Sequence, residues 1–80
     1  MPELEAFEAE VKNRIKQLAS KSARTRRNAA AWLGESGDPT AITALAKTYR
    51  DDPDPQVREA ARYALGMFRA LEKAWDEDQD

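Results

Sequence analysis

Apolar residues recur at steps of three and four along most of the chain, which is the spacing of one face of an α-helix. Three runs predict helices over about residues 23–35, 39–51 and 55–75. A fourth run, at the start of the chain, predicts a helix over about residues 2–19 whose apolar stripe consists of Leu4, Phe7, Val11, Ile15 and Leu18. The pattern therefore predicts an all-α fold.

Serine and proline residues mark where these helices begin. Ser22 is suited to cap the helix that follows it. Pro39 and Pro55 each follow an Asp and fit the first turn of a helix, where the missing N–H costs little. Pro53 disfavours the helical conformation at Asp52, so the turn before the last helix is short and stiff. Such a turn favours two antiparallel helices side by side.

The chain contains an internal repeat. The segment VREAARYALG at residues 57–66 matches TRRNAAAWLG at residues 25–34, a shift of 32 residues from position 25 to position 57. Arg58 falls on Arg26, and both segments end in Leu-Gly. A repeat of this length is the signature of stacked helical units.

The segment from Arg26 to Gly66, RRNAAAWLGESGDPTAITALAKTYRDDPDPQVREAARYALG, resembles HEAT repeats, and in particular the short HEAT-like class of phycobilin lyase subunits. An Arg-Ala-Ala helix that ends in Leu-Gly, a Gly-Asp-Pro turn and an Asp-Pro-Asp turn carry the resemblance. It implies two antiparallel helical hairpins stacked as a short HEAT-like α-solenoid. Because such repeats serve many partners, the resemblance is specific for the fold and not for the function.

The resemblance also assigns structural roles to individual residues. Asp54 and Arg58 match a turn Asp and a helix Arg that hydrogen-bond within and between hairpins, which implies a structural clasp. Arg26 matches the same arginine, but Ser20 and Ser22 stand where the acids of its hairpin are expected. The resemblance therefore does not carry the clasp over to the first hairpin.

Length and composition restrict the function. Eighty residues form one small domain, here residues 1–80, with a thin core. The absence of Cys and His excludes a disulfide framework, an ordinary zinc or haem site and His-based acid–base catalysis. No Ser, Lys or carboxylate group has the spacing of a nucleophilic or paired-acid site. The sequence predicts a non-enzyme with no catalytic residue, cofactor or metal.

Neither a membrane-spanning segment nor a secretory signal is expected from the sequence. Its longest uncharged run, PTAITALA at residues 39–46, is far shorter than the roughly 20 apolar residues that span a bilayer. The N-terminal residues are acidic, whereas a secretory signal begins with basic residues. A cytoplasmic protein without a membrane partner is expected.

The last predicted helix carries two apolar stripes. The preceding helices are expected to cover the first, which consists of Val57, Ala61, Ala64, Leu65, Phe68, Leu71 and Trp75. The second has the spacing of a seam that packs on another helix, and it consists of Ala60, Tyr63, Met67, Ala70 and Ala74. No third hairpin follows to cover it.

The predicted partner-binding residues therefore come from this helix. The partner is a foreign helix or a second copy of the chain, and the competing interpretation treats Tyr63 and Met67 as ordinary surface residues. Trp75 either closes the core or stands free beside the acidic C-terminal residues. The predicted function is a small protein–protein interaction adaptor, with self-association open, that binds through Tyr63, Met67, Ala70, Ala74 and Trp75.

Charge suggests an alternative partner. The formal net charge is −2, but residues 12–27 carry seven basic side chains and no acid. A basic patch at the start of the second helix could bind nucleic acid, and it consists of Lys21, Arg24, Arg26 and Arg27. The favoured interpretation is a solvated face that pairs with the acidic ends of the chain. A role as an accessory factor resembling phycobilin lyase or phycobilisome-handling proteins is a further alternative.

Three aromatic residues are expected to pack inside the protein. Trp32 falls on Ala64 in the repeat, on the side that faces the core, which favours packing over stacking on a ligand. Phe7 and Phe68 are also expected in the core.

Overall fold

The computed structural model describes the backbone of residues 2–78 and the side chains of residues 3–70, and every element in this part of the chain is helical. The elements are α1 (Pro2–Gln17), α2 (Ala23–Ser36), the 3₁₀ helix η1 (Pro39–Ala41), α3 (Ile42–Asp51) and α4 (Pro55–Asp78). The all-α fold predicted from the sequence is confirmed.

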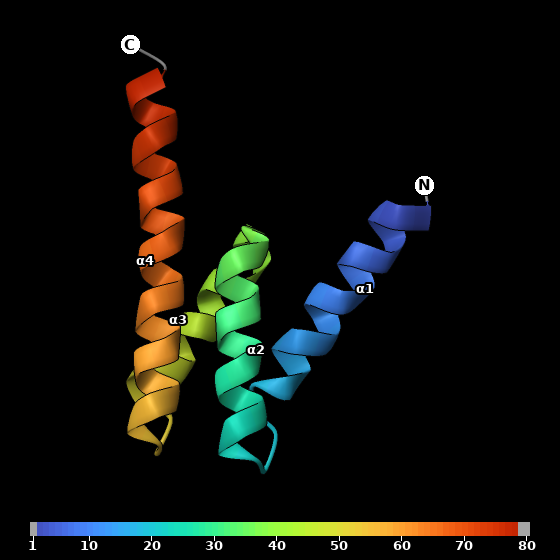
Figure 1. The fold of residues 1–80 in the computed structure, drawn as a ribbon, viewed down its shortest axis with the longest axis vertical. Coiled ribbons are helices and arrows are strands. Elements are labelled where there is room, and N and C mark those ends of the chain that lie inside the picture. The colour runs from blue at the N-terminus through green and yellow to red at the C-terminus, as the bar shows by residue number, and fades with distance from the viewer. Residues whose placement is uncertain (1, 79–80) are drawn as a thin grey trace.

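The helices form two antiparallel hairpins, α1–α2 and α3–α4, which are stacked on each other (Figure 1). The closest packing joins α2 to α4, and these two helices run side by side in the same direction. Helix α1 packs on α2 near the turn between them, and its N-terminal half leans away from the stack. The stacked hairpins expected from the HEAT resemblance are thus present.

Short polar side chains fix the starts of α2 and η1. Ser22 is extended and its Oγ accepts a hydrogen bond from the backbone N–H of Thr25. Gly37 ends α2 in the left-handed conformation, with φ of 70°, which glycine adopts without strain. Asp38 caps η1 by accepting from the N–H of Thr40. The Asp-Pro pair therefore opens a 3₁₀ turn first, and the α-helical part begins only at Ile42.

The core lies between the two hairpins. Leu33 of α2, Leu45 of α3 and Val57 of α4 are its largest fully buried side chains. Alanines fill the space between the helices, and the remaining buried apolar residues are Val11, Ala29, Ala30, Ala41, Ala61, Ala64 and Phe68. Small residues let the helices approach closely, at the cost of a thin core.

The structure corrects one predicted core residue. Phe68 is buried as expected, but the prediction for Phe7 is wrong, since 39% of this residue is exposed. Phe7 lies on the half of α1 that leans away from the stack, and its ring meets the ring of Trp32 at a centroid distance of 6.1 Å. Trp32 itself is half-buried and packs against the core cluster. The guanidinium of Arg14 lies 5.2 Å from the centre of its ring.

Candidate functional site

Helices α2 and α4 approach each other closely because one of them carries a glycine. A Cβ placed on Gly34 would lie 2.7 Å from the Cβ of Ala64 and 3.2 Å from the Sδ of Met67. Ala60, one turn before Ala64, packs against the core cluster. Part of the second stripe of α4 is therefore covered by α2.

This arrangement corrects the prediction that the second stripe has no neighbour in the chain. Ala60 and Met67 are half-buried, whereas Tyr63 and Ala70 are exposed. The stripe runs along the border between the α2–α4 contact and solvent. The second stripe therefore lies at the edge of the contact between α2 and α4 and is not the open end of the stack of hairpins.

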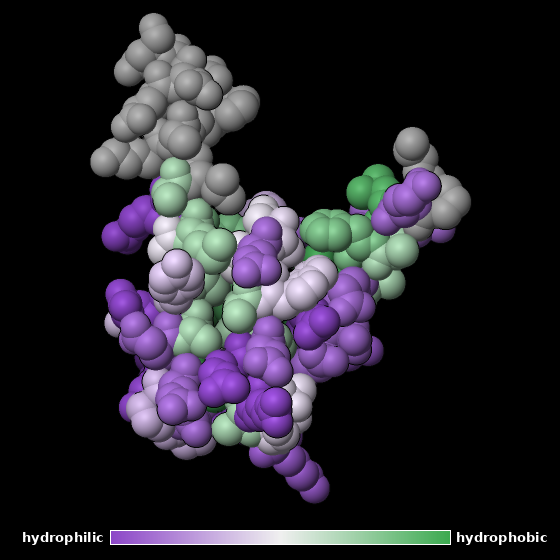
Figure 2. Space-filling view, in the orientation of Figure 1, coloured by the Kyte–Doolittle hydropathy of each residue, from purple (hydrophilic) through white to green (hydrophobic). Residues whose placement is uncertain are grey.

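A groove of about 370 Å³ follows this border. Its alanine lining contributes little side-chain volume, which leaves room for side chains of a partner. In Figure 2, which views α2 and α4 from this side, apolar surface follows the middle of α4 and polar surface gathers at the lower ends of the helices. The lining residues are Arg27, Asn28, Ala31 and Glu35 of α2 and Glu59, Ala60, Tyr63, Ala64 and Met67 of α4.

Tyr63 is the most exposed large apolar side chain of the described residues, at 68%. It stands at the groove between Ala60 and Met67. A tyrosine presents a large rigid surface and a hydroxyl, and for this reason tyrosines are enriched among the residues that dominate binding energy.

The groove unites two sites that the sequence analysis kept apart. Tyr63 and Met67 come from the predicted partner-binding set and Arg27 from the predicted basic patch. Ala70 is exposed but does not line the groove, and the side chains of Ala74 and Trp75 lie outside the described residues.

The internal repeat could have indicated from the sequence which residues line this groove. With the shift of 32 residues, Arg27 falls on Glu59, Asn28 on Ala60, Ala31 on Tyr63 and Glu35 on Met67. All eight of these residues line the groove. Two parallel repeated helices thus turn the same face to the same side.

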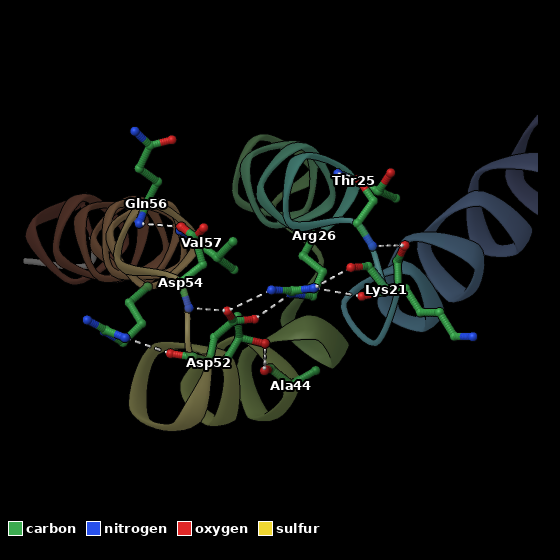
Figure 3. Close-up of polar contacts among 12 residues, drawn as sticks. Lys21, Thr25, Arg26, Ala44, Asp52, Asp54, Gln56 and Val57 are labelled. Atoms are coloured by element: carbon green, nitrogen blue, oxygen red, sulfur yellow. Dashed lines mark hydrogen bonds and ion pairs between the residues drawn. The ribbon is translucent and has the colours of Figure 1, made fainter.

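Arg26 joins the two hairpins (Figure 3). Its Nε donates to Oδ2 of Asp52 at 2.8 Å and its Nη2 to Oδ1 at 3.3 Å, a two-pronged contact. Its Nη1 donates to the backbone carbonyl of Ser20 at 2.8 Å. The two side chains are only 14% and 6% exposed. Arg26 therefore does not belong to an exposed basic patch, whereas Lys21, Arg24 and Arg27 are exposed.

Asp54 and Arg58 both hold the turn before α4, but not through each other. Oδ1 of Asp54 accepts from the N–H groups of Gln56 and Val57 at 2.7 and 3.2 Å and so caps the helix (Figure 3). Nη1 of Arg58 donates to the backbone carbonyl of Asp52 at 2.8 Å. Between these two fully described side chains the structure has no hydrogen bond. The ion pair that joins the hairpins is Arg26–Asp52 instead.

The first hairpin reproduces this turn with serines in place of acids. Ser22 donates its N–H to Oγ of Ser20 at 3.1 Å, as Asp54 donates its N–H to Oδ1 of Asp52 at 2.9 Å. Arg26 reaches the carbonyl of Ser20 just as Arg58 reaches that of Asp52, again 32 residues apart. Hydroxyl oxygens thus suffice for the turn itself. Only the ion pair between hairpins requires a carboxylate.

An exposed ion pair flanks the groove. Nη2 of Arg62 lies 2.6 Å from Oε1 of Glu59. The hydrogen bond from Arg62 lowers the pKa of Glu59, and the same bond raises the pKa of Arg62. Arg27 lines the groove near the start of α2, and its Nη1 donates to Oε1 of Gln56 at 3.1 Å. Two charged residues that line the groove, Arg27 and Glu59, therefore already have hydrogen-bond partners.

Within the described residues, no three His, Cys, Asp or Glu side chains are gathered as a metal site would require. None of the described helices combines the length and the apolar character needed to cross a bilayer. The groove on this face combines a floor of alanines, the exposed Tyr63 and charged residues at its border.

Residues 8–79 of the chain match the sequence model of a family described as HEAT repeats. A comparison with curated proteins found no match.

Proposed function

Because the chain belongs to the HEAT-repeat family, we propose that it is a small protein-binding adaptor that receives its partner in the groove between α2 and α4. The observation that carries this proposal is Tyr63, 68% exposed beside a floor of alanines. Tyrosines are enriched among the few residues that carry most of the binding energy of an interface, and apolar grooves are common binding sites. The proposed activity is binding without catalysis, and the cytoplasmic location stays a prediction.

The shape of the groove favours a partner helix or an extended segment with compact apolar side chains. The groove of about 370 Å³ accepts a few side chains over Ala31, Ala60 and Ala64. Arg27 lies near the start of α2 and Glu35 near its end, so a partner with an acidic group at one end and a basic group at the other matches both.

The test begins with a photo-crosslinking residue incorporated at position 63 in the full chain. The protein captured by this crosslinker is purified, and its affinity for the unmodified chain is measured by calorimetry. Tyr63→Ala is expected to weaken that affinity about 30-fold, which corresponds to the loss of an interface residue worth about 2 kcal/mol.

Tyr49→Ala is the matched control, since Tyr49 is an exposed tyrosine on α3 that does not line the groove. It is expected to leave the affinity unchanged. Equal losses for the two variants, or none for Tyr63→Ala, would overturn the proposal.

The alternatives make different predictions. A nucleic-acid-binding module would rely on Lys21, Arg24 and Arg27, because Arg26 is engaged with Asp52, and its affinity would fall steeply with salt. The family match does not separate the phycobilin lyase subgroup from other HEAT repeats, so a role as an accessory factor resembling phycobilin lyase or phycobilisome-handling proteins stays a prediction.

A further inference from the structure

The flank of α4 that lies away from α2 repeats the surface with which α2 contacts the second hairpin. On α2 this surface includes Arg26, Ala30, Leu33 and Gly34, and the last three are buried. The shift of 32 residues places Arg58, Arg62, Leu65 and Gly66 on the corresponding flank of α4. These four residues and Arg69, one turn further on, are called the end face below.

No described residue covers the end face as α4 covers α2. Gly66 is exposed, and a Cβ placed on it would find no atom within 4 Å, whereas at Gly34 the nearest atom would lie at 2.7 Å. Leu65 is half-buried, although its counterpart Leu33 is fully buried. The end face therefore has room for a helix to approach closely.

The side chain of Arg58 makes one hydrogen bond, whereas that of Arg26 makes four. Both donate from Nη1 to the carbonyl six residues earlier, at 2.8 Å in each case. Arg26 also binds the carboxylate of Asp52 through Nε and Nη2. Among the side chains that the structure describes, no carboxylate occupies the Nε and Nη2 positions of Arg58. One hydrogen bond fixes the guanidinium of Arg58, and the edge formed by its Nε and Nη2 is available to a carboxylate.

The charge of the end face decides between its possible occupants. Arg58, Arg62 and Arg69 lie at steps of four and seven and therefore point to one side of α4. Arg62 already pairs with Glu59, so two copies that paired through their end faces would set Arg58 and Arg69 against each other, which is unfavourable. An occupant needs carboxylates around an apolar centre.

The N-terminal half of α1 has this character. Leu4 is 56% exposed and Phe7 is 39% exposed, although both belong to the apolar stripe of α1. Glu3, Glu5 and Glu8 lie around them and are exposed. In Figure 1 this half of the helix stands apart from α2 and α4, and Figure 2 shows apolar surface on it.

We infer that the end face of one copy binds the N-terminal half of α1 of a second copy, so that the chain self-associates head to tail. A glutamate carboxylate of α1 occupies the free edge of Arg58, and Leu4 and Phe7 pack over Leu65 and Gly66. The two surfaces differ, so the contact is heterologous and builds short open chains rather than a closed dimer. Because the contact is small and rich in charge, it is weak and sensitive to salt.

The test uses the full chain and its sedimentation over a concentration range. The wild-type protein is expected to associate at low salt, with a dissociation constant that rises at least about tenfold between about 0.05 and 0.5 M salt. Two charge-reversal variants, Arg62→Glu/Arg69→Glu and Glu3→Arg/Glu8→Arg, are each expected to be monomeric. In an equal mixture, the glutamates introduced on the end face of one variant meet the arginines introduced on α1 of the other. The unchanged end face and the unchanged α1 also carry opposite charges, so the mixture is expected to associate.

Arg58 is left unchanged in these variants because it also holds the turn before α4. Circular dichroism checks that each variant is folded. Tyr63→Ala is the control for the groove and is expected to leave self-association unchanged. A wild-type chain that stays monomeric at about 1 mM and low salt, a mixture that stays monomeric, or association that disappears in Tyr63→Ala would overturn the inference.

Discussion

Asp52 is the residue through which the second hairpin holds the first. Its carboxylate accepts two hydrogen bonds from Arg26, and both side chains are largely buried. Asp52→Ala leaves the Arg26 guanidinium without its partner charge, so the free energy of unfolding is expected to fall by about 3 kcal/mol, which urea denaturation measures. That loss is a large fraction of the stability of an 80-residue chain.

The neighbouring acid provides the control. Asp51 pairs with Arg50 at 3.2 Å, but both side chains are more than half exposed, and Asp51→Ala is expected to change stability by less than about 0.5 kcal/mol. If the two variants lost the same stability, the Arg26–Asp52 pair would not be what joins the hairpins.

The sequence pointed to the right turn but to the wrong pair. The resemblance identified Asp54 and Arg58, and both do hold the turn before α4, by a helix cap and by a bond to a carbonyl. The partner of Arg26 was missed because it lies 26 residues away, in the other hairpin. Repetition identifies which positions are equivalent, but it does not show which of them meet when one unit stacks on the next.

At the scale of the helix, the two Leu-Gly ends of the repeat occupy opposite environments. Gly34→Ala would bring a Cβ to 2.7 Å from the Cβ and 2.8 Å from the Cα of Ala64, so the two helices must separate. We expect it to lower the free energy of unfolding by about 1–3 kcal/mol, despite the higher helix propensity of alanine.

Gly66→Ala is the matched variant, because it lies at the same position of the repeat with nothing within 4 Å of its Cβ. At this position only the helix propensity changes, and the free energy of unfolding is expected to rise by up to about 1 kcal/mol. Urea denaturation of both variants gives the two signs. The same sign in both would mean that α2 and α4 are not in close contact at Gly34.

The positions of the helices could be predicted from the sequence, since serine, aspartate and proline fix where the chain can enter a helix. Ser22 and Asp54 cap the helices that follow them. Which helix covers each apolar stripe of α4 could not be predicted in the same way. Periodicity shows that Ala60, Tyr63 and Met67 share a face, but α2 reaches that face only because Gly34 allows the approach.

At the scale of the whole molecule, the stack is tight in the middle and open at α1. The N-terminal half of this helix keeps Leu4 and Phe7 exposed, and the ring contact it makes is with Trp32. Because side chains in this half of α1 bury little surface, its backbone hydrogen bonds open without global unfolding of the protein. We therefore expect the amides of residues 5–10 to exchange with deuterium far faster than those of residues 57–68, where four side chains are buried.

Two substitutions separate local from global opening. Phe7→Ala removes the contact with Trp32 and is expected to speed exchange in α1 alone, because the α2–α4 packing does not depend on it. Leu33→Ala empties a fully buried site between the hairpins, costs about 3 kcal/mol and is expected to speed exchange in the slowest amides of both hairpins. Equal protection of residues 5–10 and 57–68 in the wild-type chain would instead mean that α1 opens only together with the stack.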